Sequence, residues 1–148
     1  MRYLLVVLIF SVSFAAKAQT KTVQQKIVAF CDASKDKKVG KGECWDLAKE
    51  ALDTAGAKWE APFGFGTELK KKNKVQPGDI IQFENVRIEY PDGSWKELPH
   101  HTAIVYKIIS PGKFTVAEQN VNGKRYVVFS ELDLNYIKKG KYTIYRPA

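Results

Sequence analysis

Cys44 and the paired histidines His100 and His101 are the residues whose types and spacing could perform nucleophilic chemistry. Cys44 follows a glycine-rich turn at 40–43 and begins the clearest helical pattern of the sequence. A thiol in the first turn of a helix lies near the positive end of the helix dipole, which favours the thiolate. Glu118 and Asn120 come one turn after the histidine run. A cysteine, a histidine and a polar residue that orients the imidazole are the parts of a cysteine-nucleophile enzyme.

Two helical patterns lie in the N-terminal half of the chain. Residues 22–35 place Val23, Ile27 and Phe30 on one side, which predicts a first helix. Residues 43–55 repeat apolar side chains at helical spacing from Cys44 onward, and Gly56 is a natural C-cap. This second helix therefore carries the Cys44 thiol on its buried face, at its N-terminal end.

The C-terminal half changes to short runs that are typical of strands. Turn signals of the Pro-Asp-Gly and Asn-Gly type separate these runs. The expected strands are Ile80–Phe83, Val86–Tyr90, Trp95–Leu98, His101–Ile109, Phe114–Asn120, Arg125–Phe129 and Tyr142–Arg146. Helices followed by an antiparallel meander predict an α+β fold, with the helices packed on one face of the sheet. The length suits one domain, at 19–148.

Strand alternation brings the polar residues together. His101 shares a strand face with Ala103, and Glu118 shares one with Asn120. The turn at 110–113 makes these strands antiparallel neighbours, so Glu118 and Asn120 return alongside His101. Both are candidates to orient the imidazole if the register places the two faces on the same side.

The aromatic residues of the chain provide candidate walls for a substrate cleft. A loop over 59–66 is rich in Pro, Gly and aromatic side chains, and it could equally be a surface loop tucked onto the core. The candidate substrate-binding residues are Trp45, Trp59, Phe63, Phe65 and Tyr90.

Two cysteines leave a disulfide open as an alternative. Cys31 and Cys44 could pair outside the cytosol, which would silence the nucleophile, or Cys31 could be a small buried apolar residue. Metal catalysis is the weaker interpretation, because adjacent strand residues such as His100 and His101 point to opposite faces. We expect no metal and no other cofactor.

The N-terminus has the pattern of a targeting segment. Residues 1–18 combine a positive start, an apolar stretch that is too short for a stable span, and the small-x-small sequence Ala16-Lys17-Ala18. We expect a cleaved signal peptide, no stable membrane insertion after cleavage, and a monomer in the periplasm or outside the cell. The net charge of +8 is mixed, and only the run at 70–74 is clustered. No recognition motif accompanies it, so nucleic acid is not an expected partner.

Three segments resemble the CHAP family (cysteine, histidine-dependent amidohydrolases/peptidases), a papain-like group related to NlpC-type cell-wall peptidases. Gly42-Glu43-Cys44-Trp45 is similar to the family's nucleophile helix, and Pro77-Gly78-Asp79 to its strand start. His101-Thr102-Ala103-Ile104-Val105 is similar to the family's histidine strand, and Glu118-Gln119-Asn120 to its Glu-x-Asn. Family members often carry Gln before the nucleophile, where this chain has Glu43.

The resemblance implies hydrolysis of an amide bond through a thioester, with bacterial peptidoglycan or a peptide as substrate. It implies that Cys44 is the nucleophile, that His101 is the base and acid, and that Glu118 and Asn120 orient the imidazole. Two alternatives stay open. The chain could be a binding or effector-like module that lost turnover, which Glu43 and a disulfide would favour, or a cysteine hydrolase acting on a non-wall amide.

Overall fold

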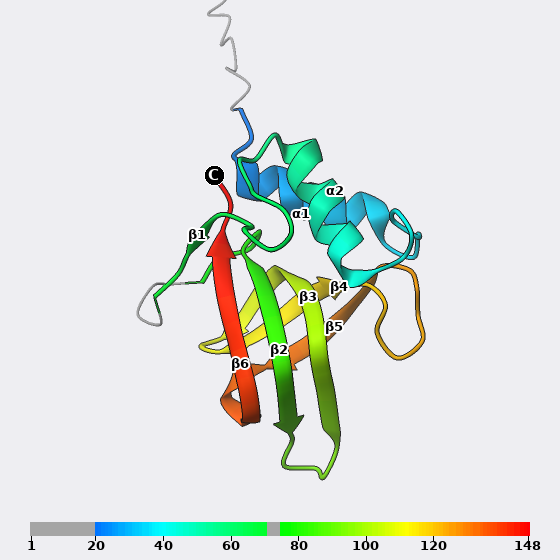
Figure 1. The fold of residues 1–148 in the computed structure, drawn as a ribbon, viewed down its shortest axis with the longest axis vertical. Helices are drawn as coiled ribbons and strands as arrows, with labels where there is room; N and C mark the ends of the chain where they lie inside the picture. The colour runs from blue at the N-terminus through cyan, green and yellow to red at the C-terminus, as the bar shows by residue number, and fades with distance from the viewer. Residues whose placement is uncertain (1–19, 71–74) are drawn as a thin grey trace, which may run out of the picture.

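The computed structural model describes residues 20–70 and 75–148 as two helices packed on one sheet (Figure 1). The expected signal peptide at 1–18 lies outside the described residues, as does the lysine-rich run apart from Lys70. The helices are α1 (Val23–Ser34) and α2 (Cys44–Ala55). The strands are β1 (Thr67–Glu68), β2 (Ile80–Glu89), β3 (Trp95–Ser110), β4 (Lys113–Glu118), β5 (Val128–Asp133) and β6 (Ile137–Arg146), with a short 3-10 helix η1 (Leu134–Tyr136) before β6.

Local signals fix the ends of both helices. Thr22 caps α1 by accepting from the backbone N–H of Gln25, whose side chain accepts from the Thr22 N–H in return. Gly56 ends α2 in the left-handed conformation at φ 70°, which favours glycine. The two helices expected from the sequence are therefore confirmed.

The sheet is antiparallel, with the strand order β1-β6-β2-β3-β4-β5. Strands β2 to β5 form the expected meander, whereas β6 returns to the other side of β2. Gly140 permits this close pairing: at φ 87°, a Cβ there would stand 2.2 Å from the carbonyl oxygen of Asn85. The meander and the helical layer match the α+β expectation, and the position of β6 adds to it.

The two faces of the sheet support separate cores. One core joins the helices to the sheet through Leu47, Ala48 and Ala51 of α2 and Ile104 of β3. The second core lies on the opposite face and includes Phe83, Ala103, Val105 and Val116. Figure 1 shows both helices gathered at one end of the sheet, with the β2–β3 hairpin extending away from them.

Several strands are longer or shifted relative to the sequence expectation. The runs at 80–83 and 86–90 form one strand, β2, and those at 95–98 and 101–109 form one strand, β3. The expected strand at 125–129 is displaced to β5, because residues up to Val127 lie in turns and isolated bridges. In β3, Pro99 and His100 are both exposed, whereas Leu98 and Ala103 share one core.

This last pattern means that β3 exchanges its faces near Pro99. Beyond this point, odd-numbered residues such as His101 occupy the face that even-numbered residues such as Leu98 occupied before it. Strand β2 does the same around Asn85, which has a positive φ of 52°, and the two strands keep a constant register across the exchange. The change of face decides which side chains of the hairpin can reach the candidate site.

Candidate active site

Cys44 is the first residue of α2, and its thiol meets His101 on β3. The helix packs on the sheet through its apolar stripe, which directs its N-terminal end toward the middle of β3. The His101 ring and the backbone N–H groups of Thr102 and Trp45 lie near the thiol and lower its pKa. The N–H groups of the first helical turn have no acceptor within the helix, so they are available near the sulfur.

Glu118 lies on the far side of the imidazole. Ala103 pairs directly with Glu118 across β3 and β4, which places Glu118 on the face that His101 shares with Ala103. His101 Nε2 lies 2.8 Å from Glu118 Oε2, and the two residues are 5% and 1% exposed. Because Nε2 is engaged by the carboxylate, Nδ1 is the ring nitrogen left for the thiol. The structure thus brings Cys44, His101 and Glu118 into one line.

The electrostatics of this line favour a charged pair. Burial would raise the pKa of the Cys44 thiol, but the hydrogen bond and charge of His101 outweigh burial and lower it. Burial would lower the pKa of His101, but its hydrogen bonds to Cys44 and Glu118 raise it to about 9. At neutral pH the imidazole is protonated and the thiol is shifted toward the thiolate, which is the form that attacks carbonyl carbon.

Other groups besides the His101 ring keep the Glu118 carboxylate ionised. Burial would raise the pKa of Glu118, but the hydrogen bond from His101 and the charge of Lys96 hold it at about 2. Lys96 Nζ lies 2.9 Å from Glu118 Oε1, and the Ser130 hydroxyl donates to the same oxygen. The sequence-based interpretation did not include Lys96 or Ser130.

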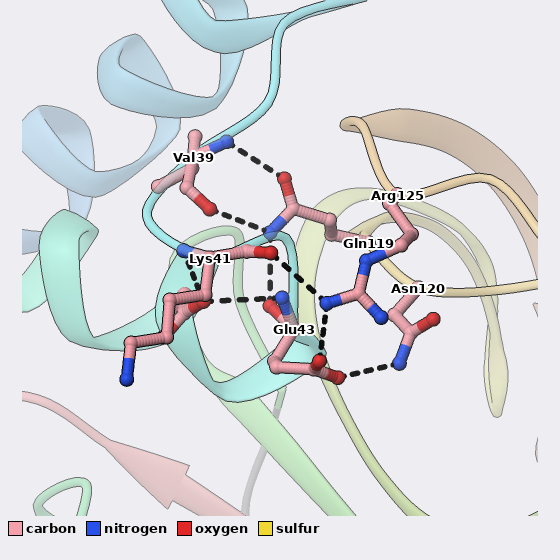
Figure 2. A network of polar contacts seen from close by, with 7 residues as sticks. Val39, Lys41, Glu43, Gln119, Asn120 and Arg125 are labelled. Carbon is pink, nitrogen blue, oxygen red and sulfur yellow. Dashed lines mark hydrogen bonds and ion pairs between the residues drawn. The ribbon is translucent and has the colours of Figure 1, made fainter.

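Asn120 lies beside the site but contacts a different group from the one expected. Its amide Nδ2 donates to Glu43 Oε2 at 2.6 Å, and the hydrogen bond of His101 Nε2 goes to Glu118. Arg125 forms an ion pair with the other Glu43 oxygen and also donates to the Lys41 carbonyl at 3.0 Å (Figure 2). The Glu43 carboxylate next to the nucleophile is therefore neutralised by Arg125 and held by Asn120.

Gln119 fixes the loop that leads into Cys44. Its Oε1 accepts from the Val39 N–H at 2.8 Å, and its Nε2 donates to the carbonyls of Val39 and Glu43 at 3.0 and 2.9 Å (Figure 2). The side chain is fully buried. Alternation places Gln119 on the face opposite Glu118, toward the helices, and this signal could have identified it from the sequence.

The aromatic candidates occupy two different places. Trp45 donates its indole N–H to the Pro62 carbonyl and packs edge-to-face on Trp59 at 5.9 Å between ring centroids. Phe63 packs on His100 at 4.8 Å, beside the catalytic candidates. Phe65 is a correction to the expectation: it is 0% exposed within the helix–sheet core, so it has no surface with which to contact a substrate.

Tyr90 lies apart from the other aromatic candidates, and it lines a cleft that His101 and Glu118 also line. The cleft has a volume of about 1030 Å³. Its walls come from the β2–β3 hairpin, where Tyr90 and Trp95 lie, and from the segment after β4 that contains Asn120. The cleft thus lies on the Glu118 side of the imidazole, and Cys44 is not among its lining residues.

Cys31 and Cys44 do not form the disulfide that the sequence left open, because both are free cysteines in the structure. Cys31 is fully buried in the helix–sheet core, and burial raises the pKa of its thiol to about 12. Cys31 therefore fits the role of a small apolar core residue, whereas Cys44 is partly exposed.

Residues 20–70 and 75–148 contain neither a metal-binding cluster nor a membrane-spanning helix. No group of three or more His, Cys, Asp or Glu side chains in these residues is placed to hold a metal ion. None of the helices in the same residues is both long enough and apolar enough to span a bilayer.

A family model for the AIM3/BBC1 cysteine proteinase-fold domain matches residues 16–148. The chain belongs to this family. One curated relative is Altered inheritance of mitochondria protein 3 from the yeast Debaryomyces hansenii, which is 26% identical over 143 residues. The match covers 82% of this chain and 15% of the yeast protein, so the chain spans a small part of that relative's length.

Solved structures with a similar fold include Ly7917 and NlpC2. The crystal structure of Ly7917 with the hydrolyzing product of MDP has a TM-score of 0.56 and 21% identity, and the match covers 86% of this chain and 63% of that one. NlpC2 from Trichomonas vaginalis has a TM-score of 0.55 and 15% identity, with 88% and 48% covered. These likenesses show the papain-like, NlpC-like cysteine proteinase fold of this family domain.

Proposed function

We propose that this chain is an exported cysteine amidase or endopeptidase that hydrolyses amide bonds in bacterial peptidoglycan. The observation that carries the proposal is the grouping of Cys44, His101 and Glu118. His101 Nε2 lies 2.8 Å from the Glu118 carboxylate, and the interaction of the ring with Cys44 lowers the pKa of the thiol and raises that of the imidazole. A partly buried pair of this kind at a helix N-terminus has the properties of an activated nucleophile and its acid.

In the first half of the reaction, the Cys44 thiolate attacks the carbonyl carbon of the scissile amide. The negative charge that develops on the oxygen is met by backbone N–H groups of the first turn of α2. The protonated His101 then donates its proton to the leaving amine, which departs as the C–N bond breaks and a thioester remains on Cys44.

In the second half, the neutral His101 accepts a proton from water, and the resulting hydroxide attacks the thioester. The acid product leaves and the thiolate–imidazolium pair returns. Glu118 holds the ring through Nε2 in both halves, so that Nδ1 faces the sulfur. The ionised carboxylate also stabilises each imidazolium state.

The choice of substrate rests on the cleft and on the order of the CHAP-like motifs. The cleft beside His101 has room for an extended chain, and the similarly folded Ly7917 has been solved with the hydrolyzing product of MDP. Export follows from the signal-peptide pattern at 1–18, and we propose that the mature chain acts as a monomer in the periplasm or outside the cell.

The pairing of Glu43 supports turnover rather than a binding module that lost it. An unpaired carboxylate next to the nucleophile would disfavour the thiolate. Here Arg125 and Asn120 both bind the Glu43 carboxylate, so its charge is compensated locally. The free state of both cysteines supports the same conclusion.

A second candidate is hydrolysis of a peptide amide outside the cell wall. The yeast relative favours it, since peptidoglycan is a bacterial polymer. The same three residues would perform the same chemistry, and only the groups that enter the cleft would differ.

The deciding experiment incubates purified muropeptides with the wild-type protein and with Cys44→Ala, and reads the products by mass spectrometry. We expect new products from the wild type and from the control Cys31→Ala, and at least a 10³-fold slower release from Cys44→Ala. A wild type that releases nothing, although iodoacetamide alkylates Cys44, would count against the wall substrate and favour the second candidate. A Cys44 that iodoacetamide does not alkylate would refute both.

A further inference from the structure

The second oxygen of Glu118 carries a pair of contacts that the reaction as described does not use. Oε2 faces His101, whereas Oε1 lies 2.9 Å from Lys96 Nζ and accepts from the Ser130 hydroxyl. The Glu118 side chain is 2% exposed and that of Lys96 is 16% exposed. Both carboxylate oxygens are therefore occupied, in a place where water screens the charges weakly.

The charge of Lys96 compensates the net charge of the site, which a neutral hydrogen-bond donor could not do. The active form of the site contains a thiolate at Cys44, an imidazolium at His101 and a carboxylate at Glu118, which sum to one negative charge. A buried net charge is strongly unfavourable unless it is compensated. The ammonium of Lys96 brings the sum of these four groups to zero.

The path of β3 explains how Lys96 reaches this position. Simple alternation along the strand would place Lys96 on the face opposite His101, because the two residues are five positions apart, an odd number. The exchange of faces at the exposed residues Pro99 and His100 returns Lys96 to the face of His101 and Ala103. The exchange of faces in β3 therefore allows the Lys96 ammonium to reach Glu118.

We propose that Lys96 is a positioning residue of this site, which acts through Glu118 to set the charge state of His101 and Cys44. The proposal rests on the proposed function, since it concerns the same thiolate–imidazolium pair. Glu118 is faced by His101 and Lys96 from β3 and by Ser130 from β5, and its charge also reaches Tyr90 of β2. Lys96 is the ammonium group among them.

Removal of the Lys96 charge has a defined sign. Without a nearby positive charge, every neighbouring group holds its proton more tightly, so the titration midpoints of His101 and Cys44 both move upward. Loss of the Ser130 hydroxyl, in contrast, removes a neutral donor and leaves the net charge unchanged. The two contacts on Oε1 can therefore be separated by their effects on titration.

The test compares Lys96→Met with Lys96→Arg, Ser130→Ala and a control, Lys113→Met, whose lysine pairs with Glu131 at the surface. The His101 ring is followed by NMR from pH 5 to 11, and the alkylation of Cys44 by iodoacetamide is followed by mass spectrometry. In Lys96→Met we expect the His101 midpoint to rise by about half a unit to one unit. Alkylation on the acid side of the Cys44 midpoint should slow by about three- to tenfold.

The other variants make the result specific to charge. Lys96→Arg keeps the positive charge, so the titration midpoints of His101 and Cys44 should equal those of the wild type. The midpoints should also stay unchanged in Ser130→Ala and in Lys113→Met. Unchanged midpoints in a folded Lys96→Met, with Cys44 still reactive, would overturn the proposal and leave the proposed function intact. If Lys96→Met does not fold, Lys96→Gln provides the same comparison. Failure of both variants to fold would make Lys96 a structural residue and would also overturn it.

Discussion

Replacement of Glu118 by Gln tests whether the carboxylate sets the charge of the imidazole. The substitution keeps the shape of the side chain and an oxygen that can accept from His101, but it removes the negative charge 2.8 Å from Nε2. Since His101 is 5% exposed, burial then acts on the ring without this compensation. We expect the pKa of His101 to fall.

The magnitude follows from the geometry. An opposite charge within about 4–6 Å shifts a pKa by about 1–3 units, and the His101 pKa of about 9 includes this contribution from Glu118. A fall of about 2 units would reduce the protonated fraction at pH 8 from roughly nine-tenths to roughly one-tenth. Hydrolysis at pH 8 should fall by at least about tenfold, since His101 can then seldom donate to the leaving amine.

NMR titration of the ring protons measures the effect directly. The chain has two histidines, so His100→Gln assigns both sets of signals. The matched control is Glu131→Gln, which removes a surface carboxylate of β5 that pairs with Lys113 at 2.8 Å. A folded Glu118→Gln protein whose His101 midpoint stays near 9 would refute the electrostatic reasoning, since the ring would then owe its charge to another group.

Two further predictions concern stability. Gln119→Ala removes three hydrogen bonds and leaves the buried backbone groups of Val39 without these partners. We therefore expect the free energy of unfolding in urea to fall by about 2–3 kcal/mol. A loss below about 0.5 kcal/mol would contradict the role of Gln119 in holding the loop. The pKa of Glu118 is lowered from 4.5 to about 2, so its contribution to stability is complete above pH 4.5 and is lost as the pH falls through 2. Wild type should lose on the order of 3 kcal/mol more than Glu118→Gln between pH 5 and pH 2, and equal losses would contradict this prediction.

The local part of the candidate site could be predicted from the sequence. The apolar spacing of residues 43–55 predicted that Cys44 begins a helix in line with its buried stripe, and the structure begins α2 at Cys44 and buries Leu47, Ala48 and Ala51. Alternation along two strands joined by a short turn placed Glu118 beside His101, and the Ala103–Glu118 pairing has this register. Both predictions depend on periodicities that a few consecutive residues determine.

The partner of Asn120 could not be predicted in the same way. Alternation applies only while the strand continues, and β4 ends at Glu118. Asn120 has a positive φ of 59°, which turns its side chain out of the strand pattern and toward Glu43. The ion pair of Glu43 with Arg125 joins residues more than eighty positions apart, and no local pattern marks such a contact.

The sequence by itself predicted the type of chemistry, because a thiol at a helix start follows from helical periodicity, and alternation makes a carboxylate the neighbour of the histidine once the strand register is known. Tertiary structure decided the electrostatic setting of that chemistry. The return of β6 beside β2 and the face exchange at Pro99 depend on how distant strands pair. The face exchange in β3 and its pairing with β4 brought Lys96 to Glu118, and the packing of the segment after β4 beside the start of α2 brought Arg125 to Glu43; charges act through distance in space rather than along the chain.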